Sequence, residues 1–275
     1  MNQAFVPVVA VLNGSVLGRA QAPSLPLTAA ELAEEARRCA EAGATYVVVS
    51  ARDPSGRPSR DPGAIRETFA AVKAASGLLV AGSLLDFDAS LAARQAIVQG
   101  RADLLEIPIG GPRLARFDAA AATFGPDRVM ALSRSELSGL ALDAQERGTW
   151  PIALATDLLD LAAVPSLLEL EFLSPAAPVA VELDASDSDG LLALRHRLSS
   201  LRWALGARGV GAWRTLGLAA SLGGGLRVGF EYGQRLPNGE VVTSNAALVE
   251  AAVRLLRAIG TEPEASNDLR AAIAA

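Results

Sequence analysis

Residues 28–51 read TAAELAEEARRCAEAGATYVVVSA, and this stretch joins the signal for a helix directly to the signal for a buried strand. Thr28 and Glu31 have the spacing of a capping box, and Gly43 is a typical residue for ending the helix. The apolar run Thr45–Ala51 that follows is rich in Val and has the length of a strand. A helix that leads into such a strand is typical of a parallel sheet covered by helices.

The same alternation continues on both sides of this stretch. Helical stretches include one that ends at Gly77, and Ser135–Gly148, Gly211–Leu222 and Ser244–Gly260. The predicted strands are Phe5–Gly14, Thr45–Ala51, Leu78–Leu84, Ala102–Ile109, Arg128–Ser133, Trp150–Ala155, Arg202–Ala207 and Leu226–Tyr232. Eight strands with helices between them predict a (β/α)8 TIM barrel, as a single domain over residues 1–275. A doubly wound open sheet is the alternative fold.

In the stretch 157–200 the predicted strand order could shift by one strand. Pro165, Pro175 and Pro178 interrupt it, because proline breaks regular structure. Val179–Leu183 nevertheless has the apolar character of a further strand.

Composition excludes several classes of function. The formal net charge of −5 gives no basic surplus, so nucleic acid is not expected as a partner. A single cysteine, Cys39, permits no intrachain disulfide, and its place on an apolar helix face predicts a buried, inert thiol. No run reaches the roughly 18 apolar residues of a membrane span, and Met1–Val11 lacks the basic start of a signal peptide. We therefore expect a cytoplasmic protein with no membrane partner.

Active sites of barrels of this kind lie at the carboxyl ends of the strands. The polar residues that the predicted strand ends place there include Ser50, Arg52, Ser83, Glu106 and Glu231. Because side chains alternate along a strand, Ser50 shares a face with Arg52, and Glu231 shares one with Arg227. If these faces point inward, the charges converge at one end of the barrel.

Two segments resemble the β-keto acid cleavage enzyme family, to which the 3-keto-5-aminohexanoate cleavage enzymes belong. Residues 44–61, ATYVVVSARDPSGRPSRD, are similar to a family stretch in which His-Leu-His-Ala-Arg-Asp is followed by Gly-Arg-Pro-Thr and an aspartate. Residues 222–260, LGGGLRVGFEYGQRLPNGEVVTSNAALVEAAVRLLRAIG, resemble the family's Gly-Gly-His-Val-Arg-Val-Gly-Leu-Glu-Asp segment, its Ser-Asn helix start and its last helix. A weaker likeness covers Leu12–Glu35.

The resemblance implies a barrel that holds one zinc ion and exchanges the acyl part of a β-keto acid with acetyl-CoA. The products are acetoacetate and a new CoA thioester, and zinc stabilises the enolate charge that builds up when the carbon–carbon bond breaks. The two metal histidines of the family correspond to Val48 and Ser50, and its carboxylate ligand corresponds to Glu231. The resemblance therefore implies a divergent member in which Glu231 is the only retained ligand position.

Other family positions correspond to Arg52 and Arg227, which match arginines, and to Tyr232, which replaces the aspartate after the metal carboxylate. A serine at the end of the fourth strand corresponds to Glu106. On this basis Arg227, Glu231 and Arg52 are the candidate catalytic residues. Ser83, Glu106 and Ser50 are the candidate substrate-binding residues.

The zinc site cannot be built from histidines in this chain. Catalytic zinc takes three protein ligands, whereas His196 is the single histidine and lies in a charged helical stretch that predicts a solvated side chain. No tightly bound cofactor is therefore expected, although Glu231 and Glu106 leave a magnesium or manganese site open. Because buried carboxylates need partners, we predict that Glu231 or Glu106 pairs with Arg52 or Arg227 where the metal would lie.

Three functions remain open. The first is the family's acyl exchange on a small carboxylate, with acetyl-CoA as co-substrate and an altered or absent metal. The second is a non-catalytic relative that binds a small carboxylate or a CoA ester. The third is a lyase or isomerase that uses arginine and glutamate alone, since one barrel fold hosts many chemistries. The resemblance also suggests a homo-oligomer.

Overall fold

Eight parallel strands close into a barrel in the computed structural model, which describes residues 5–111, 113–114, 117–118, 123–124, 128–130, 132–157, 159–169, 171–184, 188–193 and 198–275. The order around the barrel is β10, β11, β12, β13, β2, β3, β4 and β5. These strands are β2 (Val8–Val11), β3 (Tyr46–Val48), β4 (Leu79–Ser83), β5 (Leu104–Pro108), β10 (Trp150–Ala155), β11 (Val179–Asp184), β12 (Trp203–Arg208) and β13 (Gly225–Val228). The predicted TIM barrel is confirmed, and the open sheet is wrong.

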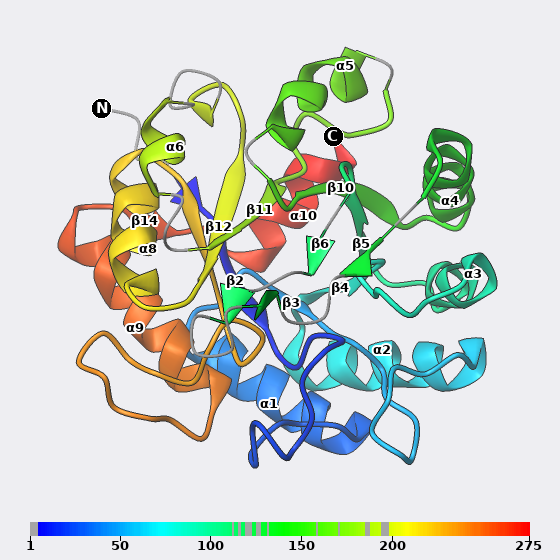
Figure 1. Cartoon of the computed structure of the whole chain (residues 1–275), viewed down its shortest axis with the longest axis horizontal. Helices are drawn as coiled ribbons and strands as arrows, with labels where there is room; N and C mark the ends of the chain where they lie inside the picture. The colour runs from blue at the N-terminus through cyan, green and yellow to red at the C-terminus, as the bar shows by residue number, and fades with distance from the viewer. Residues whose placement is uncertain are drawn as a thin grey trace.

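Helices surround the barrel (Figure 1). They are α1 (Ala29–Glu41), α2 (Pro62–Ser76), α3 (Leu91–Gln99), α4 (Arg134–Glu146), α5 (Val164–Glu169) after the 3-10 turn η1 (Asp160–Ala163), α6 (Ser188–Ala193), α8 (Ala212–Ser221) and α9 (Asn245–Ala258). The predicted capping box of α1 is present: Thr28 Oγ1 accepts from the backbone N–H of Glu31, and the Glu31 carboxylate accepts from the backbone N–H of Thr28.

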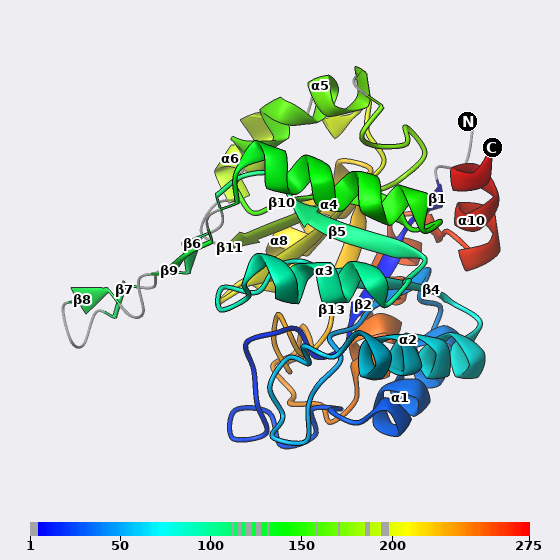
Figure 2. The ribbon, with the colours of Figure 1, turned by 90° about the vertical axis from the view of Figure 1, so that its right-hand side faces the viewer.

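One predicted barrel strand is wrong. In the described part of the segment Arg128–Ser133 the strand is β9 (Arg128–Val129), which pairs antiparallel with β6 (Arg113–Leu114) and not with a barrel strand. A second short pair, β7 (Phe117–Asp118) with β8 (Thr123–Phe124), lies beyond it, away from the barrel wall (Figure 2). The sixth barrel strand is instead β11, which pairs with β10 on one side and β12 on the other. Its run of five buried residues suits the barrel, whereas Ser133 is already the N-cap of α4.

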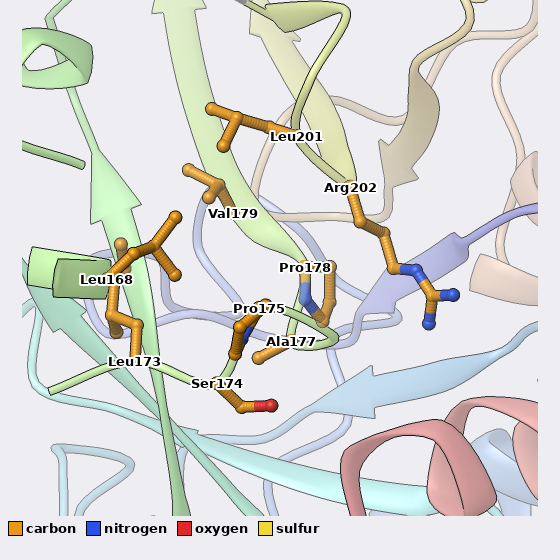
Figure 3. Close-up of a pocket in the computed structure, with 10 residues that line it drawn as sticks. Leu168, Leu173, Ser174, Pro175, Ala177, Pro178, Val179, Leu201 and Arg202 are labelled. Carbon is orange, nitrogen blue, oxygen red and sulfur yellow. The ribbon is translucent and has the colours of Figure 1, made fainter. Parts of the chain in front are cut away.

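The amino ends of the strands are closed by the end of the chain. Leu269 and Ile273 of α10 (Ser266–Ala274) pack against the barrel interior, which includes Val9, Tyr46 and Leu104. The strand β14 (Glu262–Pro263) pairs with β1 (Phe5–Val6) beside α10 (Figure 2). A cavity of about 10 Å³ near the starts of β11 and β12 has room for no more than one water molecule (Figure 3). The cavities at the opposite, carboxyl end of the strands are larger.

Candidate functional site

Polar side chains from five strands converge at the carboxyl end of the barrel. Ser50, Ser83, Glu106, Glu182 and Glu231 line one cavity of about 30 Å³. The first two follow or end β3 and β4, whereas Glu106 lies on β5, Glu182 on β11 and Glu231 just after β13. The structure thus brings together all three predicted substrate-binding residues and one predicted catalytic residue. Their roles remain predictions.

Arg227 forms the centre of the charged cluster below this cavity, and its side chain is completely buried. Its Nη1 donates to Glu106 Oε1 at 2.6 Å, and its Nη2 lies 3.4 Å from Glu182 Oε1. Its Nε donates to the Tyr232 hydroxyl at 2.9 Å, and that hydroxyl donates to Glu182 Oε1 at 2.7 Å. The predicted pairing of Glu106 with Arg227 is confirmed.

Glu231 pairs with an arginine that the sequence reading did not single out. Arg208, at the end of β12, donates from Nη2 to Glu231 Oε1 at 2.8 Å and from Nη1 to Glu182 Oε2 at 2.9 Å. Its guanidinium lies 5.0 Å from the centroid of the Tyr232 ring, which is the arrangement of a cation–π contact. The second oxygen of Glu231, Oε2, is buried and has no hydrogen-bond partner among the described residues.

The three carboxylates of the cluster differ in proton affinity. Burial raises the pKa of Glu231, and Arg208 opposes that rise only in part. Burial raises the pKa of Glu106 in the same way, against the attraction of Arg227. Burial also acts on Glu182, but Arg208 and Arg227 outweigh it and lower the pKa of that carboxyl. A proton taken up by the cluster therefore goes to Glu106 or Glu231 before Glu182.

The third predicted catalytic residue, Arg52, lies at the rim and holds two loops together. Its guanidinium donates to the backbone oxygens of Gly14 and Gly56 and reaches those of Asn13 and Ser15. Nearby, Asn13 is fully buried and exchanges two hydrogen bonds with the backbone of Ser50, at 2.8 and 3.0 Å. The contacts that the structure gives Arg52 are thus structural; its catalytic role is still a prediction.

The donor set at the mouth does not fit the zinc ion that the family resemblance implies. Of the positions that correspond to ligands, Val48 and Ser50 line the cavity together with Glu231, but only Glu231 carries a group that catalytic zinc commonly binds. Its Oε1 is bonded to the cation Arg208, which leaves Oε2 as a single donor. Among the described residues, no group of three or more His, Cys, Asp or Glu side chains could hold a metal ion. His196 lies outside the described residues.

A larger groove of about 940 Å³ adjoins the charged cluster. Tyr232 and Arg227 form part of its wall, and Trp213, Arg214 and Arg235 line it further out. The glycine-rich turn at residues 209–211, between β12 and α8, also borders the groove and leads into the helix N-terminus. The groove thus combines apolar surface with cationic groups, next to the polar cavity.

Glu182 and Arg208 are the residues that sequence reasoning missed. Glu182 is the one charged residue in the apolar run Val179–Leu183, and such an isolated charge on a buried strand signals a partner inside the protein. Arg208 directly follows the predicted strand Arg202–Ala207, where the barrel rule places functional groups. Cys39, by contrast, is buried as predicted, and burial raises the pKa of its thiol.

Comparison with known proteins connects this geometry to one family. Residues 6–274 match the family described as beta-keto acid cleavage enzyme. The chain belongs to the beta-keto acid cleavage enzyme family. It is 23% identical to the 3-keto-5-aminohexanoate cleavage enzyme of Fusobacterium nucleatum, over 96% of this chain and 95% of that protein. It is 22% identical to the enzyme of the same name from Acetoanaerobium sticklandii, over 96% of both chains.

Solved structures of ObcA share the fold of this family member. The apo structure of ObcA has a TM-score of 0.69 at 17% identity, over 92% of this chain and 66% of ObcA. Its complex with oxaloacetate and its ternary complex with a C4-CoA adduct and oxalate each give a TM-score of 0.70 at 16% identity, over 92% of this chain. The chain spans about two thirds of the length of ObcA, 67% and 68% in these two complexes.

One further finding concerns membranes. Within the described residues, no helix combines the length and the apolar character that crossing a bilayer requires.

Proposed function

We propose that this chain binds a small β-keto acid or its CoA thioester through arginine rather than zinc, and does not perform the zinc-dependent acyl exchange. The observation that carries the proposal is the ion pair of Glu231 with Arg208, at the position that corresponds to the metal carboxylate. Val48 and Ser50 stand at the histidine positions beside it. The mouth offers too few donors for zinc. The cations that attract an anionic ligand include Arg214 and Arg235 of the adjoining groove.

The groove supplies the space that the polar cavity lacks. A cavity of about 30 Å³ has no room for a keto acid, whereas a groove of about 940 Å³ has the size of a small-molecule site. Arg214 and Arg235 suit the phosphates of a CoA thioester, because a guanidinium binds phosphate oxygens in pairs. The complexes of ObcA with oxaloacetate and with a C4-CoA adduct support the same two ligand classes. A cytoplasmic location and a homo-oligomer remain predictions.

The test is calorimetric titration of the chelator-treated protein with acetoacetate, oxaloacetate and acetyl-CoA. We expect binding without added zinc. The double variant Arg214→Gln/Arg235→Gln should bind acetyl-CoA about two- to thirtyfold more weakly, since each of the two exposed charge contacts contributes about 0.2 to 1 kcal/mol. Arg254→Gln, on the exposed face of α9, is the matched control. Wild-type protein that binds none of the three compounds at millimolar concentration contradicts the proposal.

A second candidate function is metal-free carbon–carbon bond chemistry with Glu231 as the base. The unpartnered Oε2 of Glu231 favours it, because this oxygen lies at the polar cavity and burial raises the pKa of its carboxyl. A base with a raised pKa accepts a proton more readily than an ordinary carboxylate. Incubation with acetyl-CoA and a panel of β-keto acids, with and without zinc, separates the two functions. Consumption without zinc that Glu231→Gln abolishes selects the second.

A further inference from the structure

Arg208 lies between two carboxylates at the mouth of the barrel. Glu182 Oε2 accepts from its Nη1 at 2.9 Å and Glu231 Oε1 from its Nη2 at 2.8 Å, so one guanidinium joins β11 to the loop after β13. The Tyr232 ring lies beneath the guanidinium. These contacts fix the planar group in one orientation, since each edge has its own partner.

Arg208 is bound to the residue at the position of the metal carboxylate that the family resemblance implies. Glu231, which Arg208 binds, lines the same cavity as Val48 and Ser50, the two residues at the histidine positions. A guanidinium keeps its positive charge at every pH at which proteins fold, whereas a metal ion has to be captured from solution. We propose that Arg208 takes the electrostatic place of the family's metal: it holds Glu231, disfavours divalent cations, and presents a positive charge to the anionic oxygen of the ligand.

Arg208 is the best placed of the three arginines for this role. Arg227 is fully buried beneath the cavity, and Arg52 is bonded to backbone oxygens at the rim. The side chain of Arg208 is 24% exposed, whereas that of Arg227 is not exposed at all. The chain neighbours of Arg208, Ala207 and Gly209, line the groove, so the proposed contact is with a ligand oxygen that lies in the groove. A guanidinium has five N–H donors, and the pairs with Glu182 and Glu231 do not exhaust them. The proposed contact between Arg208 and the ligand rests on the proposed function, whereas the proposed weakening of divalent cation binding by Arg208 does not.

The first test restores the histidines and then varies Arg208. Val48→His/Ser50→His gives two imidazoles beside Glu231, and zinc affinity is measured by competition with a chromophoric chelator. Adding Arg208→Gln should tighten zinc binding at least tenfold, because the competing cation is removed. Adding Arg208→Lys should not, because the charge stays. Equal zinc affinity in all three proteins overturns the proposal.

Two further measurements keep the test decisive if the Arg208→Gln variant does not fold. Circular dichroism and thermal unfolding show whether the Gln variants fold. Even if they do not, submicromolar binding of one zinc per chain by Val48→His/Ser50→His, with Arg208 in place, overturns the proposal by itself.

The second test concerns the ligand. In the otherwise wild-type chain, Arg208→Gln should weaken acetoacetate binding at least tenfold, and Arg208→Lys should retain most of it. Unchanged acetoacetate affinity in Arg208→Gln overturns the proposed contact. Wild-type protein that binds no acid contradicts the proposed function, whereas a zinc affinity that still follows the charge at 208 supports the assignment of Arg208 to the metal's place.

Discussion

The ring of Tyr232 fills the space that Gly206 leaves open on the neighbouring strand β12. A Cβ atom on Gly206 would lie 2.3 Å from Cζ of Tyr232, so no other residue fits beside this ring. The packing places the Tyr232 hydroxyl between Arg227 Nε and Glu182 Oε1. Tyr232 lines the large groove, while its hydrogen-bond partner Glu182 lines the polar cavity. We infer from this that the ring and its hydroxyl separate the two spaces.

Gly206→Ala should therefore destabilise the protein. An added methyl group displaces the Tyr232 ring, and overpacking of a core costs about 1 to 3 kcal/mol. Gly217→Ala in α8 is the matched control, because a Cβ there meets nothing within 4 Å. That control should be neutral or up to about 1 kcal/mol more stable, since Ala favours a helix over Gly. Urea unfolding gives the free energy of unfolding of both variants. An equal change in that free energy for Gly206→Ala and Gly217→Ala would contradict the packing argument.

Tyr232→Ala should widen the range of acids that bind. Removing the ring joins the polar cavity to the groove, so a β-keto acid with a longer chain gains space near Arg208. Tyr232→Phe keeps the ring and should keep the wild-type preference, although loss of the hydroxyl leaves buried polar groups unpaired at a cost of about 1 to 3 kcal/mol. The measurement is calorimetric affinity for acetoacetate and 3-oxohexanoate. A Phe variant that accepts the longer acid as well as the Ala variant does would argue against a separating ring.

The sequence predicts the fold well because the signals of strands and helix ends are local. The capping box of α1 is set by residues three apart, and the apolar runs of the strands stand out without knowledge of their neighbours. The one wrong strand, Arg128–Ser133, takes the place of Val179–Leu183, whose strand signal is weakened by Pro175 and Pro178 just before it. Only its pairing with β10 and β12 shows that Val179–Asp184 belongs to the barrel. The sequence of a single segment does not determine which strands it pairs with.

The misassigned strand also limits what the sequence predicts about the site. Ser50, Ser83, Glu106 and Glu231 can be predicted because each lies on or shortly after a correctly predicted strand. Glu182 cannot be predicted in the same way, because Val179–Leu183 is not among the eight predicted barrel strands. Without Glu182, nothing indicated that Arg208 would point to the centre of the barrel and pair with Glu231 in preference to Arg52.

Asn245→Ala should loosen the loop that carries Glu231. The buried Asn245 side chain accepts from the backbone N–H of Phe230 at 2.8 Å and donates to the backbone oxygen of Leu12 at 3.2 Å. Its removal leaves two buried backbone groups unpaired, which costs on the order of 2 kcal/mol. Asn238→Ala, in an exposed turn of the same loop, should change stability by less than about 0.5 kcal/mol. Thermal and urea unfolding compare the two, and a cost at position 238 that matches position 245 would refute the argument.

Glu182→Gln should be the most damaging single change within the carboxylate cluster at neutral pH. It neutralises the group that holds both Arg208 and Arg227, and removing one partner of a buried ion pair costs on the order of 3 kcal/mol. Glu106→Gln is the control: it also touches Arg227, but burial has already raised the pKa of Glu106, so its charged form contributes less to stability. Urea unfolding of wild type and both variants at pH 7 gives the two costs.

The pH dependence distinguishes a charge effect from a packing effect. Because the folded protein lowers the pKa of Glu182, the stability that its charge provides is present above the ordinary pKa of 4.5 and is lost as the pH falls through the folded-state value. The difference in unfolding free energy between wild type and Glu182→Gln should therefore stay constant from pH 7 to about pH 5 and shrink as the pH falls below 4.5. The folded protein raises the pKa of Glu106, so ionisation of this carboxyl as the pH rises destabilises the folded state. The difference in unfolding free energy between wild type and Glu106→Gln should therefore shrink in the opposite direction, from pH 4 to pH 7. Differences that stay constant for both variants would mean that shape, and not charge, holds these two side chains.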